Sequence, residues 1–441
     1  MTRVAVIGAS IGGLIAAAEL RRREIAVTIV ERGKTVGGLY GKVDTPFGPQ
    51  ELGMHVLYVD DAQYQHLCSI FGAGAFEVWT GASVDIGATY NFGRACYDSV
   101  YPDVRSLPAA SAILDEIVRD GGKDGEAPNA LAEVIRRFGE QAGRTIVAPI
   151  LGKLWRVAPD QLTREAIHCF FDLRRIIACD KARADVLKQD PRLDAVLGNP
   201  LQSQPRGAVY GGRMAVRFKQ GATDLAPRVD DWLRRDGIEI QFERHVAISD
   251  HHLLLEGQPV DRSFEGCIVA TPVASLAPEV NTTLDQLELS IYYFKLAERL
   301  VDRVPAYYVL CQQADLEAAR IVNYSAYHHD RDPTDPEVVA VEVVHPVGAP
   351  PAEATIAREL TLVVPAATID ATYRLPRSLR VPCPTLNNGR RLDALVQGMD
   401  ATYPSSSLFF TGMRTDKGIF FSHHTIGLGH DAAMECARRL S

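Results

Sequence analysis

The sequence predicts an α/β protein of two domains. The chain has 441 residues, well beyond the roughly 250 to 300 residues at which a single hydrophobic core stops growing. Its first thirty residues read as strand, turn, helix and strand, a pattern that indicates a parallel sheet covered by helices. The composition, 46% hydrophobic and 23% charged, is typical of a folded chain and not of a disordered one.

The N-terminal unit has the spacing of a dinucleotide-binding βαβ motif. Val4–Ile7 is an apolar run of strand length, followed by Gly8-Ala9-Ser10-Ile11-Gly12-Gly13 and a helix-compatible stretch over residues 14–23. A second β-branched run, Val27–Val30, ends in Glu31. An acid roughly 20 residues beyond the glycines is the spacing of this unit. A tight strand-to-helix turn without a ligand is the alternative interpretation.

Each part of the motif has a physical task. Gly8 permits the tight turn, Gly13 lets the helix close onto the strand, and the helix-start amides and dipole favour a pyrophosphate. Glu31 would accept the ribose hydroxyls and repel the 2′-phosphate of NADP. Ser10 replaces the middle glycine, and its hydroxyl can turn toward a phosphate oxygen. The predicted nucleotide contacts of this unit are Gly8, Ser10, Ile11, Gly12, Gly13 and Glu31.

The continuation points to a flavin nucleotide. Glu31-Arg32 is followed by Gly37-Gly38-Leu39-Tyr40, and the run from Val4 to Tyr40 resembles the flavin-containing amine oxidase, protoporphyrinogen oxidase and phytoene desaturase superfamily. The resemblance implies a Rossmann-like domain that binds FAD, with the Gly-Gly backbone close to the diphosphate and the flavin. It also implies that Arg32, Gly38, Leu39 and Tyr40 contact FAD.

Four later segments resemble the same superfamily in the same order. Glu51–His55 is similar to the segment that returns the chain past the flavin ring, and Lys219–Leu225 to a turn that opens a helix. Residues 238–242 and 245–248 read as paired strands, and Cys267–Pro272 reads as a buried strand ending in a Thr-Pro turn. The FAD contacts implied by these segments are Gly53, Met54, His55, Val246, Ala270 and Thr271.

The last similar segment is the apolar strand Leu408–Phe410 with the glycine turn after it. A helix predicted to start near Leu428 would point its N–H groups at the flavin pyrimidine edge, where reduction places negative charge. The implied contacts here are Gly412, Met413, Thr425 and Ile426.

The resemblance divides the chain into two domains. The FAD-binding domain is expected to be discontinuous and doubly wound, and to comprise residues 1–60, 206–275 and 400–441. An α+β substrate-binding domain is expected over residues 61–205 and 276–399.

Within the second domain, residues 110–190 carry helical periodicity. Residues 285–390 predict a sheet with loops, because β-branched runs such as Val338–Val344 and Leu360–Val364 are interrupted by prolines. Asp330–Glu337 reads as a surface loop.

The predicted chemistry is oxidation of a small-molecule substrate by FAD. No second glycine motif follows a strand, so one nucleotide is expected, with the flavin reduced by the substrate and reoxidised by O2 or another acceptor. The resemblance places His55 beside the flavin as the candidate catalytic residue, or as a structural histidine that holds its loop. His424, next to His423, is a candidate substrate contact or an exposed loop residue.

A second interpretation comes from Ala319–Tyr327, which resembles a segment of UDP-galactopyranose mutase. In that flavoenzyme an arginine on this strand grips the substrate diphosphate, as the guanidinium fork is suited to do. The resemblance implies Arg320 and Tyr324 as substrate contacts in a reaction without net redox change. Gly412–Gly418 replaces the aromatic-rich segment of the mutases. Arg320 could instead be an ordinary ion-pair partner, and the chain could be a flavin-binding scaffold without turnover.

Composition excludes several partners. The formal net charge is −8 with no dense Lys/Arg tract, so no nucleic acid is expected. The eight cysteines form no C-x-x-C pair, and no metal site is predicted. No window reaches the ~20 apolar residues of a membrane span, and Met1 runs into a strand pattern without a signal-like segment. A cytoplasmic protein without an integral membrane segment is therefore expected, of undetermined oligomeric state.

Overall fold

The structure is a computed structural model that describes residues 2–78, 85–97, 99–200, 214–219, 225–300, 304–327, 335–365, 367–403 and 407–440. The predicted turn at Lys219–Leu225 and the predicted loop at Asp330–Glu337 lie mostly outside these residues.

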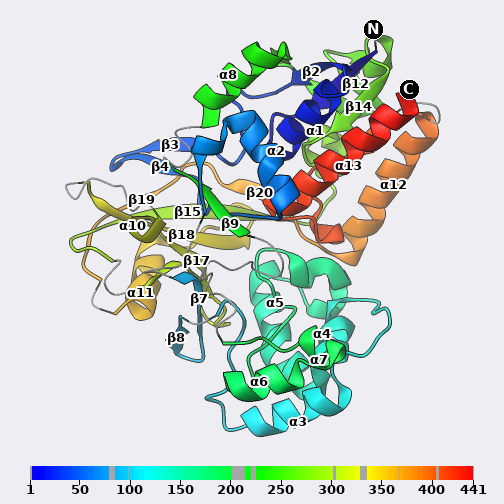
Figure 1. The fold of residues 1–441 in the computed structure, drawn as a ribbon. Coiled ribbons are helices and arrows are strands. Elements are labelled where there is room, and N and C mark those ends of the chain that lie inside the picture. The colour runs from blue at the N-terminus through cyan, green and yellow to red at the C-terminus, as the bar shows by residue number, and fades with distance from the viewer. Residues whose placement is uncertain are drawn as a thin grey trace.

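A five-stranded parallel sheet lies at the end of the molecule that carries both termini (Figure 1). Its strands are ordered β10-β2-β1-β14-β21, and all four neighbouring pairs are parallel. These strands are β10 (Glu239–Gln241), β2 (Ala26–Val30), β1 (Arg3–Ile7), β14 (Gly266–Val269) and β21 (Ser407–Phe410). The central strand is the one that precedes the glycine turn, so the turn opens at the middle of the sheet.

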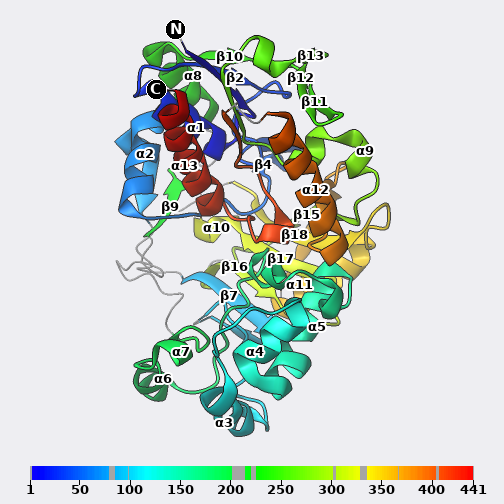
Figure 2. The same ribbon diagram turned by 90° about the vertical axis from the view of Figure 1, so that its right-hand side faces the viewer.

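Both faces of this sheet are covered, as the continuous apolar runs predict for buried parallel strands. Val4 and Val6 of β1 pack on one face in a core with the helices α1 (Ile11–Arg21), α2 (Asp61–Phe71), α8 (Leu225–Asp236) and α13 (Ser422–Leu440). Ala5 and Ile7 face the opposite core. That core contains residues of β11 (Val246–Ser249), β12 (His252–Leu255) and α12 (Leu386–Thr402). Figure 2 shows α12 and α13 on opposite sides of this parallel sheet.

Two expectations for this part are corrected by the structure. Residues 238–242 and 245–248 do not pair with each other, because β10 joins β2 in the parallel sheet and β11 pairs antiparallel with β12. The last helix begins at Ser422 and not near Leu428. Its first turns pack on α1, since a Cβ on Gly12 would lie 2.6 Å from the carbonyl oxygen of Thr425, and this contact is invisible in the local sequence.

A larger mixed sheet lies beside the first, in the order β19-β15-β18-β17-β16-β7-β8, with β20 also paired to β15. Only β16 and β7 pair in parallel. The strands are β19 (Ile369–Arg374), β15 (Gln286–Leu296), β18 (Glu337–Pro346), β17 (Ala318–Asn323), β16 (Ala306–Cys311), β7 (Asp85–Asn91), β8 (Arg94–Cys96) and β20 (Leu379–Pro382).

Residues 360–363 of the predicted strand Leu360–Val364 belong to the helix α11 (Glu353–Val363). Ile356, Leu360 and Val363 are buried at helical spacing, while Leu362 is 50% exposed. The short apolar run is therefore one face of a helix, a case in which periodicity over four or five residues cannot decide. The run Val338–Val344 does lie in a strand, β18.

Helices fill the far end of the molecule in Figure 1, within the segment 110–194. They are α3 (Ala110–Asp120), α4 (Ala130–Ala142), α5 (Ala148–Trp155), α6 (Lys181–Leu187) and α7 (Pro191–Asp194), with a π-helical turn at Gly143–Val147. Side chains of this helical layer and of the large sheet share one hydrophobic core. Tyr324 of the short helix α10 (Tyr324–Tyr327) belongs to the same core.

Smaller elements connect the two sheets. The hairpin of β3 (Lys42–Thr45) and β4 (Gly48–Glu51) precedes a three-stranded sheet ordered β5-β9-β6. Its strands are β5 (Leu57–Val59), β9 (Met214–Phe218) and β6 (Phe76–Val78). The remaining elements are β13 (Gln258–Pro259), α9 (Pro278–Asn281) and short 3-10 turns, including η4 (Arg164–His168) and η8 (Thr415–Lys417).

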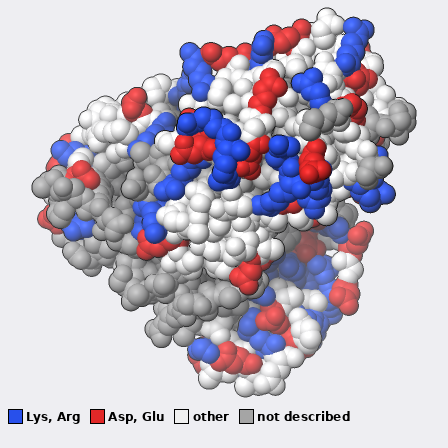
Figure 3. Space-filling view, turned by 45° about the horizontal axis from the view of Figure 1, so that its top comes forward, with Lys and Arg blue, Asp and Glu red and all other residues white. Residues whose placement is uncertain are grey.

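The surface seen in Figure 3 carries Lys and Arg side chains intermingled with Asp and Glu side chains. None of the helices in the described part of the chain combines the length and apolar character needed to cross a membrane.

Candidate cofactor and active site

Glycines are required where the chain turns from β1 into α1. Gly8 has φ +100°, a conformation that side chains with a Cβ rarely adopt. A Cβ on Gly13 would lie 2.2 Å from the carbonyl oxygen of Gly8. The turn is therefore closed by direct contact between helix and strand, as the motif predicts.

Ser10 caps this helix. Its Oγ accepts a hydrogen bond from the N–H of Gly13 at 3.3 Å and donates one to the carbonyl oxygen of Ala270 at 3.0 Å. The hydroxyl is thus used to attach the start of α1 to the end of β14, and it is not turned outward as its place in the motif suggested. The first intrahelical bond runs from Leu14 N–H to Ser10 O, so the amides of Ile11 and Gly12 have no acceptor within the helix.

Glu31 follows β2 directly and faces the glycine turn. Its Oε2 accepts a hydrogen bond from the N–H of Ala9 at 2.8 Å, and its Oε1 accepts one from Gly33 at 2.6 Å. The carboxylate therefore lies at the carboxyl edge of the sheet, beside the start of α1.

The Gly37-Gly38 pair packs against the same turn. Gly37 donates its N–H to the carbonyl oxygen of Ala9 at 2.8 Å, and both glycines have positive φ, +98° and +60°. A Cβ on Gly38 would be only 3.9 Å from Ser10. Two glycine segments nearly thirty residues apart are thus in contact, while Arg32 and Leu39 beside them are exposed.

The ends of β14 and β21 complete this edge of the sheet. A Cβ on Gly8 would meet Thr271 at 3.3 Å, and one on Gly412 would lie 2.1 Å from Thr271 O. The structure therefore brings together predicted residues from four strand ends, Gly8, Glu31, Thr271 and Gly412. The side chains of two other predicted contacts, Val246 and Ile426, are buried in the two cores that cover the sheet, and the contacts of these two residues with FAD stay predictions.

His55 is buried and held at both ring nitrogens. Its Nδ1 lies 2.7 Å from Glu51 Oε2, its Nε2 lies 2.9 Å from Leu39 O, and only 3% of the residue is exposed. The ring packs against Tyr40 with 4.7 Å between centroids. Since a carbonyl oxygen only accepts, Nε2 donates to Leu39 O, and Nδ1 forms the second hydrogen bond of the ring, with the Glu51 carboxyl group. His55 therefore ties the Gly-Gly-Leu-Tyr segment to the Glu51–His55 segment.

Buried tyrosines surround the Glu51–His55 backbone. Tyr293 and Tyr324 donate their hydroxyls to the carbonyl oxygen of Glu51 at 2.8 and 3.0 Å, and Tyr307 accepts a hydrogen bond from the N–H of His55 at 3.1 Å. Burial raises the pKa of all three phenols well above the ordinary value. The hydroxyls stay neutral and can hold these backbone groups as donors or acceptors.

Arg320 lies beside this cluster. Its guanidinium pairs with Glu342 Oε2 at 2.5 Å and stacks over Phe170 at 4.9 Å, with the residue 8% exposed. Its Nε has no hydrogen-bond partner among the described residues. Glu342 also approaches Gly53, where a Cβ would lie 2.4 Å from its Oε1.

His424 lies in the first turn of α13. Its Nδ1 accepts the N–H groups of Phe420 and Phe421 at 3.3 and 3.4 Å, and its ring is 4.1 Å from that of His423. It therefore belongs to a helix start and not to an exposed loop.

Several residues of this region were missed from the sequence. Glu342 is a single acid inside a run of valines, and Glu51 stands four residues before His55. A charged side chain within a buried strand needs a partner, so each acid could have been predicted from the sequence to pair with another polar side chain in the core. Phe170, Tyr293 and Tyr307 carried none.

The comparisons with known proteins agree with this geometry. A family model described as an NAD(P)-binding Rossmann-like domain matches residues 6–73. The fold is similar to that of a reduced UDP-galactopyranose mutase, with a TM-score of 0.68 and 16% identity over 98% of this chain and 95% of that one. The chain has the fold of these flavoenzymes.

Two further solved structures have the same architecture. A protoporphyrinogen oxidase-like protein from Exiguobacterium has a TM-score of 0.59 and 13% identity, over 98% of this chain and 99% of that one. Cyclohexylamine oxidase from Brevibacterium oxydans has a TM-score of 0.58 and 14% identity, over 100% and 99%. No curated protein matches the sequence. These neighbours include members of the groups whose motifs the sequence resembles.

Proposed function

We propose that this protein is a FAD-dependent oxidoreductase that removes a hydride from a small organic substrate. The observation that carries the proposal is the convergence of Gly8, Glu31, Thr271 and Gly412 at the carboxyl ends of four parallel strands. In open α/β sheets, ligands bind at this edge, where the strand order reverses around the central strand. The reversal here lies between β1 and β14.

The residues present fit FAD. The amides of Ile11 and Gly12 are available to a diphosphate at the start of α1, and Glu31 offers carboxylate oxygens to ribose hydroxyls beside it. The glycines at 37 and 38 leave that side free of side chains. Bound FAD would supply the hydride-accepting chemistry.

The remaining site residues would hold the substrate side. His55 is proposed as a positioning residue, because both ring nitrogens already bind Glu51 and Leu39. Tyr324, Arg320 and His424 are proposed to lie toward the substrate. The division of the chain into a FAD-binding domain of residues 1–60, 206–275 and 400–441 and a substrate domain between these segments is part of the same proposal.

The absorbance spectrum of the purified protein tests the cofactor. Bands in the near-ultraviolet and blue, present on purification or after addition of FAD, are expected. Anaerobic mixing with a panel of amines and other reduced substrates should bleach the blue band when the right substrate is present. A protein that binds no FAD would overturn the proposal, and a yellow protein that no substrate bleaches would contradict the oxidase part of it.

A mutase-like activity on a nucleotide sugar is the second candidate. It is supported by the TM-score of 0.68 to UDP-galactopyranose mutase and by Arg320, a buried arginine with an unpartnered Nε among the described residues. A diphosphate would have to compete with Glu342 for this guanidinium.

The two candidates separate in one experiment. A mutase requires previously reduced flavin and consumes no stoichiometric oxidant, whereas an oxidase reduces its flavin with substrate. Arg320→Lys keeps the charge but loses the fork that binds a diphosphate. It should weaken nucleotide-sugar binding under the second candidate, and unchanged affinity would contradict that candidate.

A further inference from the structure

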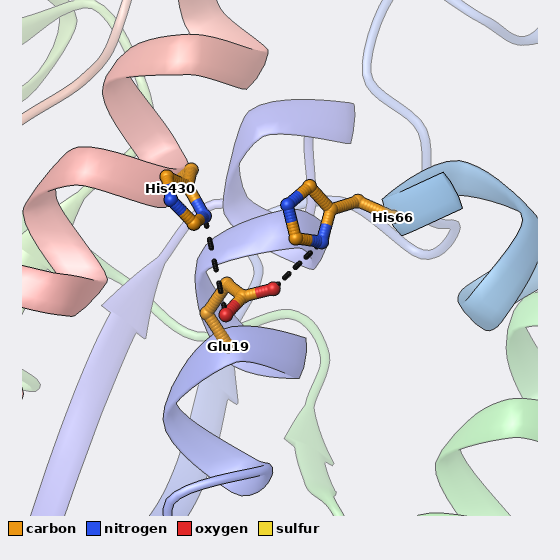
Figure 4. A group of neighbouring side chains, drawn as sticks. All are labelled: Glu19, His66 and His430. Atoms are coloured by element: carbon orange, nitrogen blue, oxygen red, sulfur yellow. Dashed lines mark ion pairs between the residues drawn. The ribbon is translucent and has the colours of Figure 1, made fainter. Parts of the chain in front are cut away.

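Three helices on one face of the parallel sheet bring Glu19, His66 and His430 together. Glu19 belongs to α1, His66 to α2 and His430 to α13, and Figure 4 shows the two imidazole rings directed toward the carboxylate. One ligand atom of each residue lies within 4.8 Å of the other two. His66 Nδ1 is 2.7 Å and His430 Nδ1 is 3.9 Å from the carboxylate oxygens.

The burial of Glu19 is unusual for its helix. Residues 11–20 of α1 are all buried, and Glu19 is the one charged side chain among them, 3% exposed. A carboxylate in that position needs compensating partners. His430 provides only a distant one, and its Nδ1 is buried without a hydrogen-bond partner among the described residues. An acid and an unsatisfied imidazole nitrogen thus face each other across a helix interface.

Two arginines also reach this carboxylate. Arg23 donates to Glu19 Oε2 at 2.9 Å, and Arg22 donates to Oε1. Both guanidiniums are partly exposed, 34% for Arg23 and 41% for Arg22, so either can turn to solvent. Their positive charges repel a cation at the cluster and so lower the affinity of the cluster for a metal ion. Arg22 also contacts His66 Nδ1 directly at 3.0 Å.

We propose that Glu19, His66 and His430 bind a divalent transition-metal ion of the Zn²⁺ type, linking α1, α2 and α13. Imidazole nitrogen and carboxylate oxygen are suitable ligands for Zn²⁺, which binds them at about 2.0–2.2 Å. Closing the cluster to that size requires the two imidazole rings to move toward the carboxylate, and their side chains are 20% (His66) and 35% (His430) exposed. Water would complete the coordination.

Titration of the chelator-treated full-length protein with ZnCl2 and CoCl2 tests the site. One ion per chain is expected by calorimetry, together with a saturable rise in Tm of at least about 2 °C and a visible Co²⁺ absorption band. His430→Ala and His66→Ala should each lower the affinity at least tenfold. His252→Ala, which removes an exposed histidine of β12, should leave it unchanged.

Arg22→Ala provides a test in the opposite direction. Loss of the guanidinium that contacts both Glu19 and His66 should tighten metal binding several-fold. Absence of saturable binding in both the parent and Arg22→Ala would overturn the proposal. So would binding that both histidine variants retain at full affinity, because the ion would then be held elsewhere. Because the His430 side chain is 35% exposed, its replacement keeps the test valid if His66→Ala fails to fold. The outcome is independent of the proposed flavin chemistry.

Discussion

The buried pair of Glu51 and His55 allows a quantitative test of what the histidine does. Both residues are at most 5% exposed, and His55 also donates to Leu39 O. We consider three variants, Glu51→Ala, His55→Ala and the double replacement. Each single replacement removes one hydrogen bond from a buried polar partner, beside the Tyr40 ring that packs on His55.

The magnitude follows from burial. Removing one partner of a buried, hydrogen-bonded pair costs about 1–3 kcal/mol, since the remaining group stays desolvated. The double variant removes both polar groups, so neither member of the pair stays buried without its partner. Its loss of unfolding free energy should therefore be smaller than the sum of the single losses by about 2 kcal/mol, within the range found for residues in contact.

Urea unfolding followed by circular dichroism and tryptophan fluorescence measures these free energies, provided the two signals coincide, as a single cooperative transition requires. The surface pair Lys34–Glu243, with 3.5 Å between charged atoms and both side chains mostly exposed, is the matched control and should show almost no coupling. Losses for Glu51 and His55 that add to within about 0.5 kcal/mol would refute the reasoning and leave His55 free for a direct catalytic role.

Three further outcomes are expected. Glu31→Gln should weaken FAD binding about 10- to 100-fold, because a hydrogen bond to a charged group contributes about 1.5–3 kcal/mol; a fluorescence titration measures this, exposed Glu24→Gln is the control, and equal affinities would contradict the site. Gly429→Ala, whose Cβ would lie 2.3 Å from Gly12 O, should lower stability by about 1–3 kcal/mol, whereas Gly427→Ala on the same helix meets only ordinary contact and should raise it by up to about 1 kcal/mol; thermal unfolding of the pair shows whether the signs differ. Burial and, to a smaller extent, the charge of Arg174 lower the pKa of His168 to about 4. As the pH falls, the unfolded chain therefore binds a proton at this histidine before the folded chain does, and the free energy of unfolding should fall between about pH 6.5 and pH 4 by at most about 3 kcal/mol. His168→Gln should reduce this pH dependence when unfolding is measured across the same range, and an unchanged dependence would contradict the assignment to His168.

The carboxyl edge of the parallel sheet was predictable because its determinants are local. Gly8 must be glycine for a positive φ, and the runs that become β1 and β2 are apolar on both faces because both faces are covered. Glu31 follows directly from the end of its strand. Sequence spacing alone therefore places these groups at one edge of the sheet.

Elements whose form depends on distant contacts were not predictable in the same way. Helix α13 begins six residues before the expected Leu428, because its first turns are supported by α1 and not by strong local preference. Strand β10 pairs with β2, although β11 is the nearest strand along the chain. A strand pattern identifies an exposed or buried face but not the partner strand.

The region around Arg320 shows the same limit at the level of single residues. Arg320 and Glu342 are opposite each other in the register of β17 and β18, so two charges that the sequence places in separate apolar runs neutralise each other in the core. Knowledge of the register would have predicted the pair, since neither charge can be buried alone. The pair also constrains the function: an anionic substrate gains Arg320 only by displacing Glu342 or by binding at the unpartnered Nε. A neutral or cationic substrate meets no such competition, which is the physical reason for preferring the oxidoreductase over the mutase.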